Sequence, residues 1–161
     1  MLNKSRFIFL FLVLFLISGT TFYAQTKSKF KVVLDAGHGG KDPGAMYYGL
    51  KEKDIALDVT LRVGKILDNN PEIRVTYTRK TDVFIELIDR PKIANKEDAD
   101  LFISIHCNGA KNIQAYGTET FVMGLSRSAA NLEVAKKENS VILLESNYQE
   151  KYNGFDPNKP E

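Results

Sequence analysis

Two short apolar segments constrain how this chain can fold, because each ends in a polar loop that contains a histidine. Residues 30–34 and 101–105 are almost entirely apolar, which is typical of strands that a sheet buries on both faces. His38 follows the first segment and His106 the second, and the chain has only these two histidines. If the strands run parallel, their carboxyl ends lie at one edge of the sheet, where open α/β sheets bind ligands. The pattern therefore predicts one site shared by both imidazoles.

The segments around these strands predict an α/β fold. Apolar residues four positions apart predict a helix over residues 51–68, with an inward face formed by Ile55, Val59, Val63 and Leu67. Alternation over residues 73–77 predicts another strand, and residues 90–96 predict a second helix. Strands alternating with helices predict a single α/β domain with a mostly parallel twisted sheet and helices on both faces.

Two further elements are expected after the second histidine. Residues 118–123 predict a fourth strand. Ser126 or Ser128 can cap a long helix that reaches Asn147. The tail over residues 148–161 is rich in Asn, Gly, Pro and charged side chains.

The first residues have the pattern of a secretory signal peptide. Lys4 and Arg6 precede an unbroken apolar run over residues 7–17, and small and polar residues follow it. The run is too short for a comfortable permanent span, and an uncleaved N-terminal anchor is the alternative interpretation. We therefore predict a signal peptide over residues 1–24, a domain over residues 25–161, and a periplasmic or secreted location with no permanent membrane span.

Charge and cysteine content narrow the function further. Removal of Lys4 and Arg6 leaves 20 basic and 20 acidic residues, so no basic excess favours contacts with nucleic-acid phosphates. Cys107 is the single cysteine and cannot form an internal disulfide. It directly follows His106 and should face the other way along the strand, which favours burial as a small apolar side chain.

Glu52 is the third candidate site residue. It stands one turn before Ile55, on the predicted inward face, and a carboxylate facing a core is costly unless it is paired or bound to a metal. With His38 and His106 it makes a set of two histidines and one carboxylate, which with water in the fourth position is a catalytic zinc arrangement. Two alternatives stay open: the helix dipole also favours a glutamate in a first turn, and the glycine-rich loop could bind a phosphate.

The segment Leu34-Asp35-Ala36-Gly37-His38-Gly39-Gly40-Lys41-Asp42-Pro43-Gly44 closely resembles the opening motif of zinc-dependent N-acetylmuramoyl-L-alanine amidases, which are cell-wall hydrolases. The resemblance continues through Glu52, Arg79, residues 90–95, Ser104-Ile105-His106-Cys107-Asn108 and Gly117-Thr118-Glu119-Thr120. It implies that His38, Glu52 and His106 bind zinc.

The resemblance also implies a reaction, the hydrolysis of the amide between N-acetylmuramic acid and L-alanine in peptidoglycan. Two alternatives remain, a non-catalytic wall-binding or regulatory module of the same fold and a zinc peptidase acting on cell-wall peptides. The sequence leaves open whether a protein partner activates the chain.

The sequence offers no clear counterpart of the glutamate that acts as general base in the family. In the family this glutamate lies on a late strand, whereas here a polar tail ends at Glu161. We therefore expect the domain to be incomplete at its C-terminus, with late strands missing and the base beyond Glu161. Glu145 is interpreted as a surface residue of the long helix, and Glu119 as structural or as a neighbour of the metal ligands.

Three nearby side chains receive supporting roles. Asp35 could orient a zinc-binding imidazole, because ligating histidines usually donate their second ring hydrogen to a carboxylate or carbonyl. Asn108 could touch substrate, although a turn is the simpler interpretation. Arg90 is interpreted as a buried ion-pair partner.

Overall fold

A three-stranded parallel sheet forms the centre of the computed structural model, which describes residues 28–108, 114–122 and 129–157. Strand β1 (Phe30–Ala36) lies between β4 (Ile73–Tyr77) and β5 (Leu101–Ile105), and both pairings are parallel. The middle strand is the most buried, as its apolar sequence predicts, with Val33 and Leu34 at 1% and 0% exposure. The same expectation is wrong for β5, because it lies at the edge of the sheet and its Leu101 and Phe102 are 43% and 39% exposed. The predicted α/β fold is confirmed.

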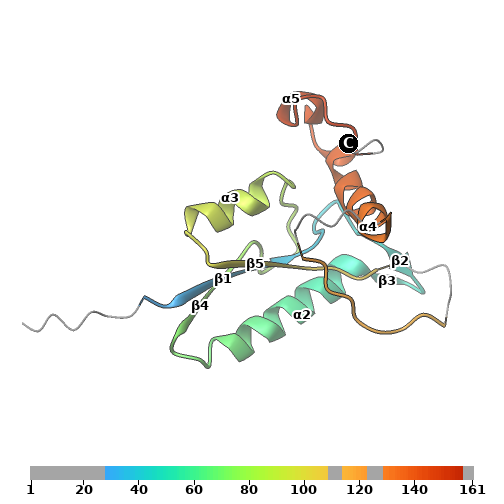
Figure 1. The fold of residues 1–161 in the computed structure, drawn as a ribbon. Coiled ribbons are helices and arrows are strands. Elements are labelled where there is room, and N and C mark those ends of the chain that lie inside the picture. Colours follow the sequence, from blue (N-terminus) through green and yellow to red (C-terminus); the bar gives the residue numbers. More distant parts are fainter. Residues whose placement is uncertain (1–27, 109–113, 123–128, 158–161) are drawn as a thin grey trace, which may run out of the picture.

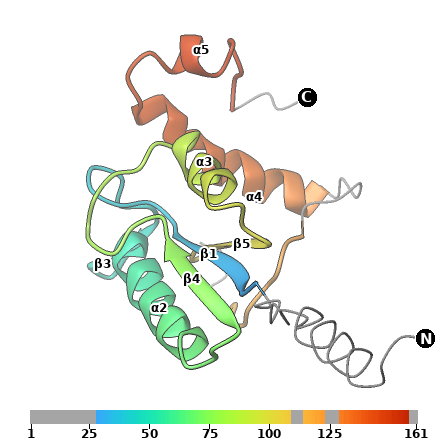
Figure 2. The same cartoon turned by 90° about the vertical axis from the view of Figure 1, so that its left-hand side faces the viewer.

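Helices cover both faces of this sheet (Figures 1 and 2). Helix α2 (Glu52–Leu67) packs on one face, and α3 (Asp89–Lys96) packs on the other. Helix α4 (Ala129–Asn139) lies on the same side as α3, and η1 (Ser140–Leu144) and α5 (Tyr148–Lys151) follow it. Between β1 and α2, an antiparallel hairpin is formed by β2 (Met46–Tyr47) and β3 (Leu50–Lys51).

The buried face of α2 differs from the predicted one. Ile55 and Val59 are each 39% exposed, whereas the stripe of Ala56, Thr60 and Gly64 is buried. Small side chains let the helix axis approach the sheet closely, and the larger apolar residues are displaced to its flanks. The spacing of four positions was correct, but the stripe was offset by one residue.

The elements expected after β5 also need correction. Residues 118–122 form no strand, and residue 123 and both candidate cap serines lie outside the described residues. The predicted long helix is divided, because Glu145 has an extended backbone and Asn147 is left-handed with φ of 57°. These two conformations end η1 before the separate helix α5 begins.

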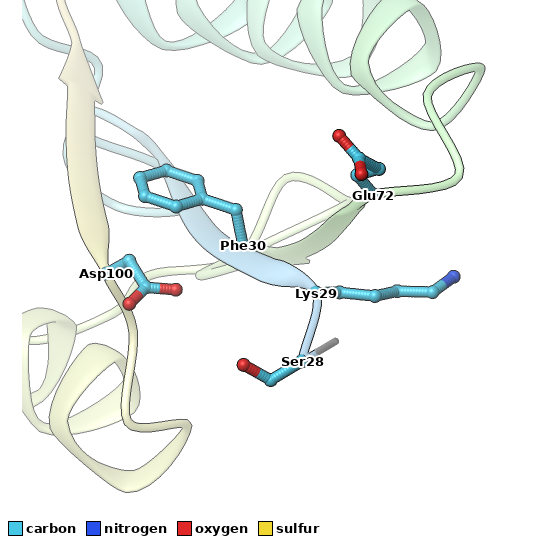
Figure 3. Close-up of a pocket in the computed structure, with 5 residues that line it drawn as sticks. All are labelled: Ser28, Lys29, Phe30, Glu72 and Asp100. Carbon is cyan, nitrogen blue, oxygen red and sulfur yellow. The ribbon is translucent and has the colours of Figure 1, made fainter. Parts of the chain in front are cut away.

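An open depression lies at the amino-terminal edge of the sheet, opposite the histidine loops (Figure 3). It is lined by Ser28, Lys29, Phe30, Glu72 and Asp100. The predicted signal peptide over residues 1–24 lies outside the described residues. No helix within the described ranges is long and apolar enough to cross a membrane.

The close approach of α2 to β4 can be tested at Gly64. A Cβ at this position would overlap the Tyr77 ring. Alanine normally favours a helix over glycine by up to about 1 kcal/mol, but overpacking costs about 1–3 kcal/mol, so we expect Gly64→Ala to lower the free energy of unfolding. Urea titration measures the change, with Lys65→Ala on the exposed side as control. Equal or greater stability of Gly64→Ala would contradict the close packing.

Candidate metal centre

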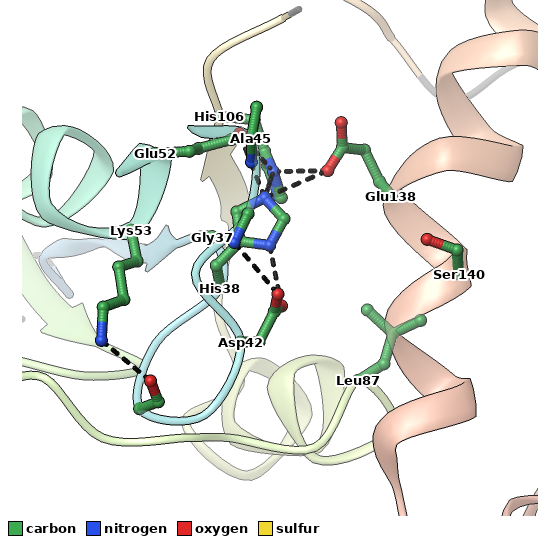
Figure 4. A network of polar contacts seen from close by, with 12 residues as sticks. Gly37, His38, Asp42, Ala45, Glu52, Lys53, Leu87, His106, Glu138 and Ser140 are labelled. Atoms are coloured by element: carbon green, nitrogen blue, oxygen red, sulfur yellow. Dashed lines mark hydrogen bonds and ion pairs between the residues drawn. The ribbon is translucent and has the colours of Figure 1, made fainter. Parts of the chain in front are cut away.

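Four side chains converge at the carboxyl ends of β1 and β5 (Figure 4). They are His38, Glu52, His106 and Glu138, and each offers a ligand atom within 4.8 Å of those of the others. Because β1 and β5 are parallel neighbours, with Ala36 opposite Ile105, the two histidine loops begin side by side. The structure thus brings together the three site residues that the sequence predicted and adds one.

The distances between these atoms suit a tetrahedral ion. His38 Nε2 lies 3.1 Å from Glu52 Oε1 and 3.2 Å from His106 Nδ1. His106 Nδ1 lies 3.3 Å from the same Glu52 oxygen. Ligand atoms about 2.0–2.1 Å from a tetrahedral zinc are about 3.3–3.4 Å apart. Two imidazoles and a carboxylate are also a donor set that zinc prefers, so these residues fit the metal that the family resemblance implies.

Glu138 was not predicted from the sequence. It reaches from α4 to the side of the imidazoles away from Glu52, with Oε2 2.8 Å from His106 Nδ1 and 3.3 Å from His38 Nε2. Both of its carboxylate oxygens are buried without a well-directed hydrogen bond. A buried carboxylate without such bonds is costly unless charge compensates it, which the imidazoles or a bound cation can do. Glu138 is therefore a fourth potential ligand.

Asp42 orients the His38 ring. Its Oδ2 lies 2.8 Å from His38 Nδ1, and its Oδ1 accepts a hydrogen bond of 3.1 Å from the Gly44 amide. Both side chains are buried. This contact leaves Nε2 of His38 to face the cluster, the arrangement in which a carboxylate fixes the ring of a ligating histidine.

Asp35, for which that orienting role was predicted, has a different one. Its carboxylate accepts hydrogen bonds from Thr78 Oγ1 at 2.6 Å, Ser104 Oγ at 2.6 Å and Arg90 at 2.8 Å. Asp35 faces the strands rather than the imidazoles, because strand residues alternate between faces and His38 lies beyond the strand end. The prediction that Arg90 is a buried ion-pair partner is confirmed, since its side chain is 5% exposed.

Two arginines hold the backbone of the His38 loop. Arg79 donates hydrogen bonds to the carbonyls of Ala36 and Gly37, and Arg90 donates to those of Ala36 and His38. The His38 backbone itself is left-handed, with φ of 59°. Such a conformation persists in a non-glycine residue when its surroundings determine it, and the guanidinium groups supply those surroundings.

Glu52 is fixed by two backbone amides. Its Oε1 accepts a hydrogen bond of 2.6 Å from the Cys107 amide, and its Oε2 accepts one of 2.9 Å from the Ala45 amide. Cys107 thus contributes its backbone, while its half-buried thiol is not among the clustered ligand atoms. Asn108 donates to Glu119 at 3.0 Å in an exposed contact.

The charges of the cluster support one another. Burial opposes protonation of both imidazoles, but nearby carboxylates outweigh it and raise the pKa of His38 to about 11 and that of His106 to about 9. Burial would raise the pKa of the two glutamates, but the imidazoles hold the pKa of Glu52 far below its usual range and lower that of Glu138 to about 2. Without a metal, the carboxylates therefore favour the protonated form of the imidazoles in the cluster.

Glu145 is a buried anchor, which corrects its interpretation as a surface residue. It is 5% exposed and accepts hydrogen bonds from the Leu87 amide at 2.7 Å and from the Tyr152 hydroxyl at 2.9 Å. Lys41 also donates to the Leu144 carbonyl at 2.5 Å. These contacts tie η1 to the loop before α3 and to the His38 loop, and so fix the C-terminal end of α4.

Comparisons of the sequence and of the fold with known proteins agree on one family. The family model for N-acetylmuramoyl-L-alanine amidase matches residues 32–159. The chain is 52% identical over 88 residues to an endolysin of Bacillus phage SPP1, which covers 53% of this chain and 32% of the endolysin. It is 46% identical over 113 residues to the N-acetylmuramoyl-L-alanine amidase AmiA of Escherichia coli K12, covering 70% of this chain and 38% of AmiA.

Solved structures agree with these matches. The N-acetylmuramoyl-L-alanine amidase from Clostridium difficile 630 aligns with a TM-score of 0.52 at 29% identity, over 73% of this chain and 64% of that one. The CwlD amidase from Clostridioides difficile, solved in complex with the GerS lipoprotein, aligns with a TM-score of 0.54 at 28% identity, over 74% and 70%. The chain belongs to the N-acetylmuramoyl-L-alanine amidase family. It spans about a third of the length of the curated relatives named above.

The cluster predicts how stability without metal depends on pH. A folded pKa above the unfolded value of 6.5 means that the stabilisation by His38 and His106 is complete below pH 6.5 and is lost as pH rises through about 9 and about 11. The free energy of unfolding in a metal chelator should therefore fall between pH 6.5 and 8.5. Urea titrations across this range measure it. His106→Asn should flatten the slope, and an equally steep slope in that variant would exclude the imidazoles as its source.

Proposed function

We propose that this chain hydrolyses the amide bond between N-acetylmuramic acid and L-alanine in peptidoglycan with the help of zinc. The convergence of His38, Glu52 and His106 at ligand distances carries the proposal, and membership of the amidase family supplies the substrate class. A cell-envelope location, periplasmic or secreted, is consistent with that substrate and with the predicted signal peptide.

Different residues of the chain would bind the zinc ion and hold its ligands in position. His38 through Nε2, His106 through Nδ1 and Glu52 through Oε1 would hold the ion. Zinc bound there would lower the pKa of a water and polarise the substrate carbonyl. Asp42 keeps the His38 ring in its ligating orientation, while the amides of Ala45 and Cys107 keep the Glu52 carboxylate in place.

Product analysis tests the proposed reaction. The full chain, loaded with one equivalent of zinc, is incubated with purified muropeptides, and mass spectrometry should find stem peptides with a free L-alanine amino terminus. Replacement of both histidines, His38→Ala with His106→Ala, should abolish turnover and zinc retention together, because it leaves at most two ligands.

Other products would favour the alternatives. Stem peptides shortened from their carboxyl end would identify a zinc peptidase. Binding to peptidoglycan with zinc retained but no turnover would favour a non-catalytic wall-binding module, or an amidase domain whose general base is not among the residues of this chain. Retention of stoichiometric zinc by the double histidine variant would refute the ligand assignment itself.

The role of Glu138 can be separated from that of the other ligands. Its Oε2 lies 2.8 Å and 3.3 Å from the two nitrogens that are proposed to bind zinc, so we propose Glu138 as a fourth ligand. We expect Glu138→Ala to keep one equivalent of zinc but to weaken binding about tenfold, because three protein ligands and water hold the ion less tightly. Chelator competition measures the affinity, and cobalt absorption reports the changed coordination. Glu133→Ala, on the exposed side of α4, is the matched control, and equal affinities of the two variants would contradict the assignment.

A further inference from the structure

The hairpin β2–β3 exposes an unusual group of apolar side chains beside the metal cluster. Met46, Tyr47, Tyr48 and Leu50 are 65%, 60%, 89% and 62% exposed, and the Tyr47 and Tyr48 rings meet edge to face at 4.3 Å between centroids. Large apolar groups that gather on a surface without burial commonly mark an interaction site. We name these four residues the hairpin patch.

The turn of the hairpin places a tyrosine in a backbone conformation that is unfavourable for this residue type. Tyr48 and Gly49 are its two central residues, and both have positive φ, 49° and 78°. This geometry suits the twist of a two-residue hairpin, and Asn or Asp before Gly is the usual sequence for it. A left-handed backbone carries a conformational cost in tyrosine, because its Cβ crowds the neighbouring carbonyl oxygen. Because the Tyr48 side chain is 89% exposed, burial within the described fold does not recover that cost.

The hairpin patch is rigidly connected to the candidate ligand Glu52. Lys51 ends β3, and Glu52 begins α2. Ala45, directly before β2, donates its amide hydrogen to Glu52 Oε2 at 2.9 Å and accepts the Glu52 amide hydrogen at 2.8 Å. The last paired residues of the hairpin, Tyr47 and Leu50, therefore lie about 7 Å along the strands from Ala45 and Glu52, two residues at about 3.4 Å each. A substrate that is held at the metal cluster and is longer than this distance would be able to reach the hairpin.

We propose that the hairpin patch binds the glycan part of the substrate and so helps to select it. This inference rests on the proposed function, in which the amide to be cut is attached directly to a sugar. A pyranose ring has an apolar face of C–H groups and a rim of hydroxyls. Tyrosine matches both features, because its ring packs on apolar surface and its hydroxyl forms hydrogen bonds at the edge. The exposed Tyr47 ring shares a face of the hairpin with its cross-strand partner Leu50, and the Tyr48 ring meets it edge to face, so these side chains offer apolar surface for such a sugar ring.

Binding measured apart from turnover tests the proposal. The full chain is titrated with soluble peptide-free glycan strands and, separately, with free stem peptide, with zinc present. The double variant Tyr47→Ala with Tyr48→Ala should bind glycan about tenfold more weakly, the loss expected when two stacking rings are removed, with stem-peptide binding unchanged. Ile66→Ala, which removes a 69% exposed apolar side chain near the far end of α2, is the matched control and should bind both ligands normally.

Kinetics extend the same test to the reaction. On a substrate with both sugars attached to the peptide, the double tyrosine variant should raise KM with little change in kcat, while a lactoyl-peptide without sugars should show no difference. Unchanged glycan affinity, or a loss of stem-peptide binding instead, would overturn the role of the hairpin patch while leaving amidase activity intact. Loss of glycan binding in a chain that shows no amidase turnover would retain the hairpin patch and reject the proposed function.

Discussion

The buried Asp35 carboxylate is the interaction on which the sheet and the site both depend. It joins the end of β1 to Thr78 after β4, to Ser104 in β5 and to Arg90 in α3. Arg90 in turn binds the carbonyls of Ala36 and His38. An unpaired charge in this position would be strongly destabilising, so each partner requires the others. One network thus aligns the three strands and holds the His38 loop at their carboxyl ends.

The ring nitrogens that face the cluster can carry either protons or a metal. Nearby carboxylates raise the pKa of His38 and His106, although burial opposes this effect. A metal at these nitrogens would displace the protons that they carry, so metal binding is expected to weaken as pH falls. Pairing between imidazoles and carboxylates explains how these titratable side chains can be packed together.

Local sequence patterns predicted the strands, the helices and the meeting of the two histidines. Alternation predicted the strand of residues 73–77, and an almost entirely apolar run predicted that of residues 101–105. The helix predicted over residues 90–96 is also present. His38 and His106 were predicted to meet because parallel strands share an edge. The orienting role for the His38 ring could have been assigned to Asp42 rather than to Asp35 from the sequence. Asp42 lies in the same loop as His38, and such a loop can fold back so that the two side chains meet, whereas Asp35 lies within the strand.

The remaining features depend on tertiary contacts that periodicity does not encode. Glu138 lies in a charged stretch, Lys136-Lys137-Glu138-Asn139, that resembles any solvated helix. It reaches the cluster only because Glu145 and Lys41 anchor η1, and neither contact has a sequence signal. The buried stripe of α2 was misplaced for a related reason. Hydrophobicity favoured Ile55 and Val59, whereas close approach to the sheet required small residues such as Ala56 and Gly64.

The position of Glu138 places a physical requirement on catalysis. A zinc ion with four protein ligands has the closed coordination of a structural site, whereas hydrolysis needs water in one position. If zinc binds as proposed, the Glu138 oxygen would have to give way to water, and the cost would be modest because only ion-pair contacts hold it. Glu52 differs, since two backbone amides bind its oxygens. Of the two carboxylates in the described cluster, Glu138 is therefore the one that we expect to exchange with water, and Glu52 the one that we expect to stay.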